Sequence, residues 1–326
     1  MQQHLKRFVL RIYGKLLFLL EKKSFDRLPF EYKDLPYDTA VLLRIPTYDG
    51  SGQAVHPDIV RVRDPELLFV MAMTPYPFDD DYFENPSIVV SRDGLRFYEE
   101  KKGINPIVPP PDFDHNNDPD LLFSEGTWNM VYLETLRPGK QNLVLLQSND
   151  RIQWKRKNLL MFELQGTSKD TLIASPALVE KEGSYYLFYV NLSTTPYRIE
   201  CIISRSIDRW DKKKIAVPEF DALNVTPWHI DVFKDEGLYY MLLADITITR
   251  QGKRVHALHL ADSKDLYQWN VHPEPIEIGK LKNLKSLYRS TGFREGNDMY
   301  IFFSAEFKGL IWRIGVIRKQ MNSLIG

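Results

Sequence analysis

The sequence is poor in features that would assign it to several common classes of protein. It contains one cysteine, Cys201, so no disulfide bond can form within the chain. A single thiol fits a reducing compartment. The 43 basic residues equal the 43 acidic ones, and the absence of a basic excess disfavours nucleic-acid binding. We therefore expect a cytoplasmic protein with no nucleic-acid partner.

The chain also lacks a hydrophobic run long enough to cross a membrane. Residues 5–20 form its most apolar stretch near the N-terminus, and Arg11 and Lys15 interrupt it. A spanning helix needs about 20 predominantly apolar residues. No small-residue cleavage site follows, which disfavours a signal peptide. Apolar residues recur there at helical spacing, which predicts an amphipathic helix; they are Leu5, Phe8, Val9, Ile12, Leu16 and Leu19.

Two roles are open for this helix. Leu17 and Leu20 widen its apolar face, which favours burial of that face against the rest of the protein or a partner chain. The alternative is peripheral association with a membrane surface through its lysines and arginines. We assign residues 1–37 to the helix and a linker, and residues 38–326 to the main domain.

A repeat of about 55 residues dominates the rest of the chain. A Glu-Gly pair precedes an aromatic-rich strand at Glu125, Glu182, Glu236 and Glu295, and residues 65–74 form a weaker copy. Glu-Gly tolerates the positive φ of a tight hairpin. This period is close to the length of a four-stranded propeller blade. The sequence therefore predicts an all-β, five-bladed β-propeller with an N-terminal helical extension.

A Ser-x-Asp turn that ends near an aromatic residue accompanies the repeat. It occurs at residues 91–97, 148–154, 206–210 and 263–269. Its Asp can accept hydrogen bonds from backbone donors of its own turn, and we expect its aromatic residue to pack against the next blade. The fifth copy lacks this turn, and the strand at residues 40–46 is predicted to supply the missing outer strand of the last blade.

The first residues of the predicted innermost strands are polar in every blade. They form the segments 56–58 (HPD), 118–120 (DPD), 175–177 (SPA), 229–231 (HID) and 289–291 (RST). Side chains two residues apart on a strand point the same way. Three same-side pairs should thus meet at one mouth of the channel: His56 with Asp58, Asp118 with Asp120, and His229 with Asp231. Asp-Pro and His-Pro also occur as ordinary strand-start signals.

Crowded carboxylates of this kind suit general acid–base hydrolysis. One carboxyl pKa should rise through repulsion, while Arg289 would hold others down. Glu84, with Asn85, precedes a strand of the first blade, and the polar loop at 112–120 adds His115 and Asn117. Tyr76 offers a flat face on which a sugar ring could stack.

Three segments carry a resemblance to a known family: DPDLLFSEGTWNMVY, SPALVEKEGSYYLFYV and HIDVFKDEGLYYMLLA. Over roughly residues 50–318 the chain resembles the five-bladed glycoside hydrolases of the arabinanase and β-xylosidase type, family 43. The resemblance implies three catalytic carboxylates, from blades 1, 2 and 3. Asp118 matches the blade 2 position, and His56 stands at the blade 1 position. Ala174 and Ser175 stand where the family's acid is expected.

The leading functional hypothesis is therefore a glycosidase-like protein acting on a glycan. Asp58 would be base or nucleophile, Asp118 or Asp120 would tune its pKa, and Glu84, Asp231 or His229 would donate the proton. The predicted substrate-binding residues are His56, Asp120, His115, Asn117, His229, Arg289, Ser175 and Tyr76. A non-catalytic glycan-binding propeller, serving in recognition or assembly, is the alternative. His-x-Asp pairs also suit a metal, but we expect no cofactor, with structural calcium as the alternative.

Overall fold

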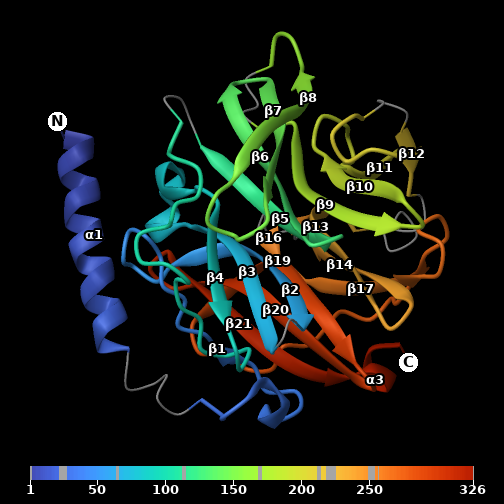
Figure 1. The fold of residues 1–326 in the computed structure, drawn as a ribbon. Helices are drawn as coiled ribbons and strands as arrows, with labels where there is room; N and C mark the ends of the chain where they lie inside the picture. The colour runs from blue at the N-terminus through green and yellow to red at the C-terminus, as the bar shows by residue number, and fades with distance from the viewer. Residues whose placement is uncertain are drawn as a thin grey trace.

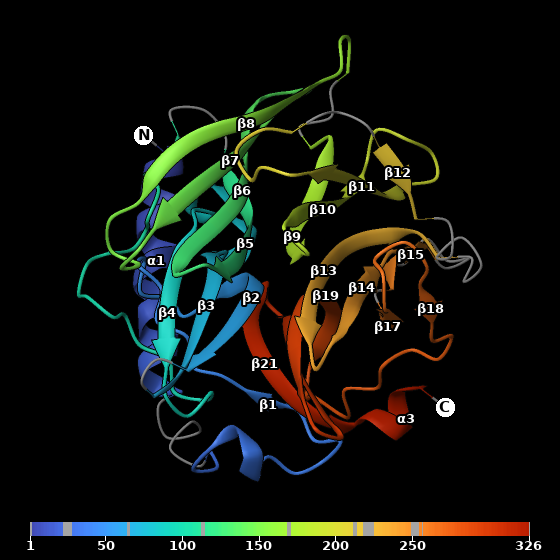
Figure 2. The ribbon, with the colours of Figure 1, turned by 45° about the vertical axis from the view of Figure 1, so that its right-hand side comes forward.

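Five antiparallel sheets stand around a central channel, as the blades of a propeller (Figures 1 and 2). This computed structural model describes residues 2–21, 28–63, 66–111, 115–167, 171–210, 214–217, 225–248, 254–255 and 257–325. The five innermost strands contact one another in the order β2, β5, β9, β13 and β19, and β19 returns to β2. The predicted five-bladed architecture is confirmed.

The strands of each blade follow one another outward from the channel. Blade 1 contains β2 (Ala54–Arg63), β3 (Leu67–Pro75) and β4 (Ser87–Ser91). Blade 2 contains β5 (Asn116–Ser124), β6 (Thr127–Arg137), β7 (Lys140–Ser148) and β8 (Lys155–Glu163). Blade 3 contains β9 (Ile173–Lys181), β10 (Ser184–Asn191), β11 (Arg198–Ser204) and β12 (Lys214–Ala216).

The last two blades complete the ring. Blade 4 contains β13 (Pro227–Asp235), β14 (Leu238–Asp245), β17 (Leu258–Ser263) and β18 (Asn270–Val271). A hairpin of β15 (Thr247–Ile248) and β16 (Arg254–Val255) extends from it. Blade 5 contains β19 (Leu284–Glu295), β20 (Asp298–Phe307) and β21 (Ile311–Gln320), followed by the short helix α3 (Met321–Ile325).

The N-terminal strand β1 (Val41–Leu42) closes the ring as the outer strand of blade 5. Val41 pairs antiparallel with Val316, and Leu42 with Gly315. The Leu43 amide then donates a hydrogen bond of 2.8 Å to the Ile314 carbonyl. The predicted contribution of residues 40–46 to the last blade is thus confirmed, and it ties the two ends of the propeller together.

The repeated turns adopt the geometry that the sequence predicts. Glu125 and Gly126 both have positive φ, 51° and 76°, and the pairs at 182–183 and 236–237 behave alike. Two successive residues with positive φ are characteristic of the type I′ hairpin. In the fourth copy only Gly296 has positive φ, 62°, because Glu295 still pairs with Asp298 in the sheet. In the Ser-x-Asp turns, Asp93 Oδ1 accepts from the Leu95 and Arg96 amides at 2.9 and 2.7 Å. These turns are therefore structural.

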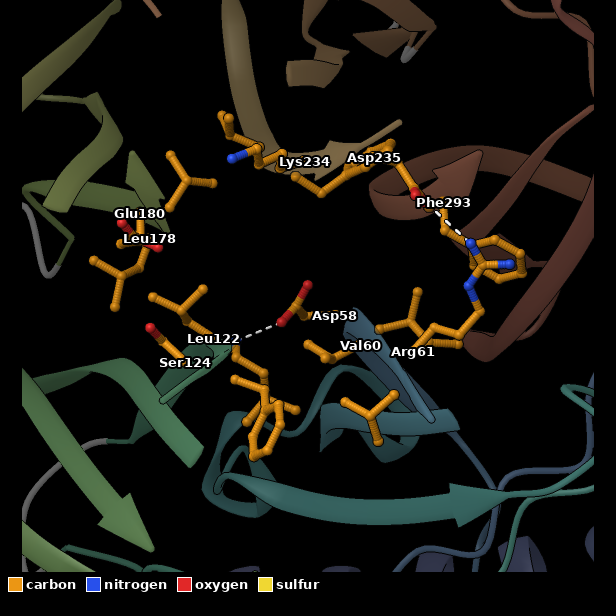
Figure 3. Close-up of a pocket in the computed structure, with 18 residues that line it drawn as sticks. Asp58, Val60, Arg61, Leu122, Ser124, Leu178, Glu180, Lys234, Asp235 and Phe293 are labelled. Carbon is orange, nitrogen blue, oxygen red and sulfur yellow. Dashed lines mark hydrogen bonds and ion pairs between the residues drawn. The ribbon is translucent and has the colours of Figure 1, made fainter. Parts of the chain in front are cut away.

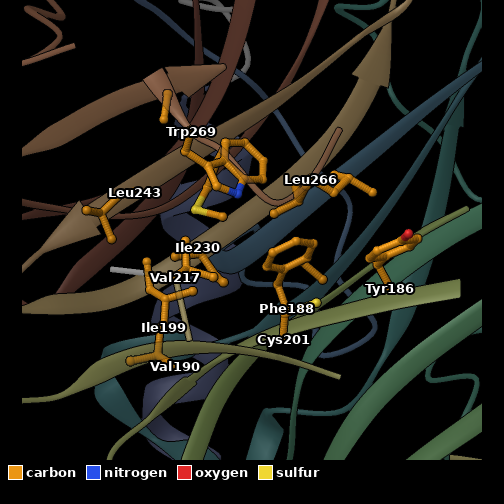
Figure 4. Close-up of a cluster of buried hydrophobic side chains, with 14 of the residues drawn as sticks. Tyr186, Phe188, Val190, Ile199, Cys201, Val217, Ile230, Leu243, Leu266 and Trp269 are labelled. Atoms are coloured by element: carbon orange, nitrogen blue, oxygen red, sulfur yellow. The ribbon is translucent and has the colours of Figure 1, made fainter. Parts of the chain in front are cut away.

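The aromatic residue after each Ser-x-Asp turn packs against the preceding blade, so the prediction that it packs against the next one is wrong. Trp269 of blade 4 lies in the apolar cluster between blades 3 and 4, 5.7 Å from the Phe188 ring (Figure 4). Trp210 of blade 3 likewise packs between blades 2 and 3. The turn folds back from the third strand of its own blade, and this places its aromatic side chain against the blade that comes before it in the sequence.

The core consists of five apolar clusters, each between two adjacent blades. Figure 4 shows the one formed by blades 3 and 4, in which Phe188 and Cys201 face Ile230 and Trp269. Because each blade is apolar on both faces, polar side chains are concentrated along the channel and the outer edge. Burial between blades thus positions the innermost strands, whose side chains form the candidate site.

The N-terminal helix α1 (Gln2–Leu20) lies against blade 1 and the loops beside it (Figures 1 and 2). Arg7 pairs with Asp80, with nitrogen–oxygen distances of 2.8 and 3.0 Å. Arg11 Nε donates to the Asp49 carbonyl at 3.2 Å. The helix is docked on the propeller, as expected, but through the face that carries Arg7, Gly14 and Phe18. The opposite apolar face is exposed within this chain, with Leu20 76% exposed. Among the described residues, no helix is both long and apolar enough to span a bilayer.

Candidate functional site

A β-bulge interrupts each innermost strand where its polar segment begins. The register shifts fall between Val55 and Asp58 in β2, between Asn117 and Asp120 in β5, and between Ala174 and Ala177 in β9. In β13 and β19 they come slightly earlier relative to the polar segment, between Pro227 and His229 and between Leu287 and Ser290. A bulge leaves a residue outside the ladder and re-aims its side chain. In three blades the residue after the bulge position is proline, which has no amide hydrogen to lose from the ladder.

Three of these bulges hold a non-glycine residue at positive φ. They are His56 at 54°, Asp118 at 51° and Ser175 at 50°. Such backbone strain costs roughly 1–3 kcal/mol and is concentrated at functional sites. At this end of the channel the backbone is therefore strained, and the strain serves to direct the His56, Asp118 and Ser175 side chains.

Side chains from three blades converge at this level of the channel. His56, Asp118 and His229 each offer one ligand atom, and these atoms lie within 4.8 Å of one another. His56 Nε2 is 3.1 Å from Asp118 Oδ1, and His229 Nδ1 is 3.7 Å from the same oxygen. All three side chains are buried. We call these three residues the upper cluster.

Second contacts fix the orientation of each member of the upper cluster. His56 Nδ1 lies 2.9 Å from Thr74 Oγ1, and His229 Nδ1 lies 2.6 Å from Ser175 Oγ. Asp118 Oδ2 accepts a hydrogen bond of 2.8 Å from the Ser175 amide. These contacts leave His56 Nε2 and Asp118 Oδ1 facing each other, and neither has a hydrogen-bond partner of suitable geometry within the described part of the chain.

The protonation states of the upper cluster suit a cation. Burial lowers the pKa of His56 to about 4, so its imidazole is neutral at pH 7. Burial acts to raise the pKa of Asp118, but His56, His229 and Arg289 outweigh it and lower that pKa to about 2. Two imidazoles and one carboxylate are a common ligand set for a catalytic divalent metal, which keeps further coordination positions open. The residues present therefore fit a metal ion.

Glu84 and His115 stand beside the upper cluster. Glu84 Oε1 lies 3.9 Å from His56 Nδ1, and Glu84 Oε2 lies 3.6 Å from His115 Nε2. The Asn117 amide nitrogen is 3.2 Å from the same His115 nitrogen. The Glu84 carbonyl accepts from the Asn116 amide at 3.0 Å, which anchors the Glu84 loop to blade 2. A second carboxylate is thus held close to the predicted metal ligands.

A row of aromatic rings leads from the rim to the upper cluster. The Tyr76 and Trp312 centroids are 5.6 Å apart, and Trp312 is 5.4 Å from Tyr288. Tyr288 in turn lies 4.1 Å from the His229 ring and 5.4 Å from the His56 ring. Flat apolar faces that end in polar groups are suited to stacking against sugar rings.

A lower cluster forms two residues further along the same strands. Asp58, Asp120 and Asp231 approach one another within 4.8 Å, and all are buried. The fully buried Arg289 lies among them, with Nη2 2.9 Å from Asp120 Oδ1 and 3.8 Å from Asp231 Oδ1. Because Arg289 already supplies positive charge here, we assign no metal to the lower cluster.

The lower carboxylates also join neighbouring blades. Asp58 Oδ2 accepts a hydrogen bond from the Leu121 amide of blade 2, and Asp120 Oδ2 accepts one of 2.8 Å from the Leu178 amide of blade 3. Asp58 Oδ1 accepts from Thr291 Oγ1 of blade 5 at 3.2 Å. Burial, together with the charge of Asp231, raises the pKa of Asp58 to about 7. Burial and the charges of Asp58 and Asp231 raise that of Asp120 well above its ordinary value.

A cavity of about 350 Å³ occupies the other end of the channel. The later residues of the innermost strands line it, including Leu122, Leu178 and Lys234 (Figure 3). Asp58 lines it too, and its carboxylate points into the open centre of this view. Asp58 therefore belongs to the far side of the channel from Glu84.

The structure brings the predicted site residues together in two groups rather than at one mouth. His56, Asp118, His229, Ser175, Glu84, His115 and Asn117 gather at the bulges, and Tyr76 begins the aromatic row. Asp58, Asp120, Asp231 and Arg289 form the lower cluster. We expected both residues of each pair, such as His56 and Asp58, to lie at the same mouth of the channel. The structure instead places the first residue of each pair in the upper cluster and the second in the lower cluster. Residues 112–114 of the polar loop lie outside the described residues.

Sequence reasoning missed Thr74, Tyr288 and Trp312. Tyr288 directly precedes Arg289 at the bulge of β19, between Leu287 and Ser290. The only sequence feature that pointed to a role for Tyr288 was its position directly before the polar segment 289–291. Thr74 and Trp312 lie in β3 and β21, where nothing in the repeat distinguishes them from other strand residues.

Comparison with known proteins supports the fold. No family model matches the chain. The chain is 36% identical over 79 residues, 23% of its length, to an A type blood N-acetyl-α-D-galactosamine deacetylase of Flavonifractor plautii. It is 31% identical over 118 residues, 30% of its length, to sucrose-6-phosphate hydrolase of Bacillus subtilis. The matches span 10% and 24% of these relatives' own lengths.

Solved structures extend the similarity to the whole propeller. An N-acetylgalactosamine deacetylase from F. plautii, in complex with blood group B trisaccharide, aligns over 87% of this chain and 96% of its own, with a TM-score of 0.70 and 19% identity. A thermostable family-43 glycoside hydrolase aligns over 82% and 89%, with a TM-score of 0.59 and 12% identity. This chain shares their fold. The expected resemblance to family-43 propellers is thereby confirmed for the architecture.

Proposed function

We propose that the protein is a metal-dependent hydrolase that removes the acetyl group from an N-acetylated sugar. The observation that carries this proposal is the upper cluster, in which His56, Asp118 and His229 present ligand atoms within 4.8 Å of one another. Glu84 lies within 4 Å of one of these ligands. The similarity to a deacetylase in both a sequence segment and the whole fold supports this choice of bond.

Each residue has a defined role in this reaction. The divalent ion held by the upper cluster would polarise the amide carbonyl and a bound water. Glu84 takes one proton from the water as its oxygen adds to the carbonyl carbon. Glu84 then gives this proton to the amide nitrogen as the carbon–nitrogen bond breaks. The acetic acid that forms gives its remaining proton to the amine, so the products are acetate and the ammonium form of the amino sugar, and atoms and charge balance without an oxidant or reductant.

The substrate would be held by the aromatic row. Tyr76 and Tyr288, both half-buried, offer faces for the sugar ring, and the buried Trp312 lies between them. Ser175 and His115 lie close enough to the upper cluster to bind hydroxyl groups of the sugar. Asn117 supports His115 and acts as a positioning residue. The lower cluster is structural in this proposal, since its carboxylates are occupied by Arg289 and by amides of neighbouring blades.

Metal content and acetate release together test the proposal. The purified protein is incubated with glycosides of N-acetylgalactosamine and N-acetylglucosamine, and acetate and free amine are quantified. Chelation should abolish release, and zinc or manganese should restore it. Glu84→Gln should keep the metal but lower kcat at least 100-fold, within the range of general acid–base catalysis. His56→Ala should lose both metal and activity.

A matched control uses another histidine paired with a carboxylate. His272 Nε2 lies 2.7 Å from Asp262 Oδ1 on blade 4, away from the channel. His272→Gln should therefore keep both metal and activity. The assignment would be refuted if protein shown to contain no metal still released acetate, or if Glu84→Gln left kcat unchanged.

Glycoside hydrolysis is the second candidate, and the fold shared with a family-43 glycoside hydrolase favours it. In that case Asp58, Asp118, Glu84 and Asp231 would carry the chemistry. The same incubations distinguish the two reactions, because cleavage of a glycosidic bond releases a reducing sugar and no acetate. Binding without either product would favour a non-catalytic glycan-binding propeller.

A further inference from the structure

The outward face of α1 is a continuous apolar stripe. Its members are between 46% and 76% exposed; they are Leu5, Phe8, Val9, Ile12, Leu16, Leu19 and Leu20. At 100° per residue these side chains cover an arc of about 120° along the helix. Tyr13, next to this arc, stacks on Phe78 of the propeller at 5.8 Å. Figure 1 shows the helix at the edge of the propeller, with one side turned away from it. A stripe this wide in water is unfavourable, which marks it as an interaction surface.

The opposite face of the helix is specifically attached to the propeller. Besides the ion pair between Arg7 and Asp80, the Arg44 guanidinium lies 3.9 Å from the centre of the Phe18 ring. Gly14 is buried against Ser51 so closely that a Cβ at this position would lie 2.9 Å from Ser51 Cβ. The apolar stripe is therefore held outward by the docking of the other face.

The charges beside the stripe are all positive. Lys6 lies beyond Tyr13 on one side of the stripe, and Lys15 borders Phe8 on the other, with its side chain lying against Gly50 of the propeller. Both lysines are exposed. No acidic residue occurs in residues 1–20. A second copy of the helix would bring lysine against lysine along this stripe, whereas anionic lipid headgroups would complement both borders.

We infer that α1 binds the surface of a membrane rich in anionic lipids, with its apolar stripe among the acyl chains and its opposite face on the propeller. Lys6 would extend from one border toward lipid phosphates. Lys15, whose side chain lies along Gly50, would add positive charge at the other border. The loop that leads to Glu84 contacts the other side of the helix through Asp80. That rim of the candidate site would then lie about one helix diameter, 10–12 Å, from the bilayer.

Vesicle co-sedimentation of the full chain tests this inference. The protein should bind vesicles of phosphatidylcholine mixed with phosphatidylglycerol, and bind phosphatidylcholine alone far more weakly. Ile12→Asp with Leu16→Asp should lower the partition coefficient at least 100-fold, because two buried apolar side chains are lost. Lys6→Gln with Lys15→Gln should lower it about 25-fold, roughly fivefold for each lysine.

A control pair carries the same kind of change elsewhere on the surface. Leu164 and Leu310 are 42% and 40% exposed and lie outside the helix. Leu164→Asp with Leu310→Asp should bind vesicles as the unaltered protein does. Circular dichroism of every variant checks that the propeller is folded.

Two results would overturn the inference. One is equal binding of the Ile12→Asp/Leu16→Asp variant and the unaltered protein to anionic vesicles, or no binding by either. The other is a dimer in light scattering that this variant converts to a monomer, which would assign the stripe to a second copy. Neither readout depends on acetate release, so failure here leaves the proposed function to its own test.

Discussion

Replacing Arg289 with methionine should strongly destabilise the propeller. Arg289 is fully buried and is the cation among Asp58, Asp120 and Asp231. Its Nη1 also donates a hydrogen bond of 3.1 Å to the Pro119 carbonyl at the bulge of β5. Methionine fills similar space without charge, so the substitution mainly removes the compensation of buried carboxylates.

The expected loss is about 3–5 kcal/mol in the free energy of unfolding, the usual cost of removing one partner from a buried ion pair. The remaining carboxylates, already raised in pKa by burial, would then face one another without a counter-ion. Asp120→Asn on the same background should recover part of the loss. A coupling of about 1–3 kcal/mol between the two sites is expected for groups in one network.

Guanidinium unfolding of four proteins measures this cycle: the unaltered chain, Arg289→Met, Asp120→Asn and the double variant. Arg137→Met is the control, since Arg137 forms an exposed pair with Glu163 at 2.8 Å. Such surface pairs contribute about 1 kcal/mol at most. If Arg289→Met is no more destabilising than Arg137→Met, the lower cluster does not depend on Arg289 and its structural assignment is refuted.

Three further predictions concern closure, a turn and the aromatic row. Deleting residues 38–47 removes β1 and should abolish cooperative unfolding in guanidinium, whereas deleting residues 2–20 should preserve it; a cooperative 38–47 deletion would contradict closure by β1. Asp93→Ala should cost about 1 kcal/mol at pH 7. Partial burial acts to raise the pKa of Asp93, but amide hydrogen bonds lower it, so this contribution is present above pH 3.8 and shrinks as the pH falls further; an equal cost at pH 7 and pH 3 would contradict it. Tyr288→Leu should raise KM for the acetylated sugar at least tenfold with the metal retained, while Tyr98→Leu, at an exposed site, changes neither; an unchanged KM would exclude stacking on Tyr288.

Much of the fold follows from local sequence. The Glu-Gly pairs require positive φ, and the structure has it at residues 125–126, 182–183 and 236–237. The Ser-x-Asp turns satisfy their own backbone donors. Even ring closure by residues 40–46 was predictable, because the last copy of the repeat lacked an outer strand. These features depend on neighbouring residues, so the sequence contains the information directly.

The depth of each site residue in the channel was not predictable in this way. The alternation of side chains along a strand correctly predicted that both members of each pair, such as His56 and Asp58, point toward the channel. It could not show that the bulges place the first members beside Glu84, and the second members around Arg289. That division depends on contacts between blades, and in particular on where Arg289 of blade 5 meets Asp120 of blade 2.

The five-bladed repeat, the closure strand and the amphipathic character of residues 5–20 can therefore be predicted from local sequence. Which groups of the inner strands share a cation, and which way the apolar stripe of α1 faces, depend on how the whole chain folds. The difference lies in the range of the interactions. Turns and periodicity arise within a few residues, whereas docking of α1 rests on Asp80 and Ser51, and the two clusters rest on residues up to 233 positions apart.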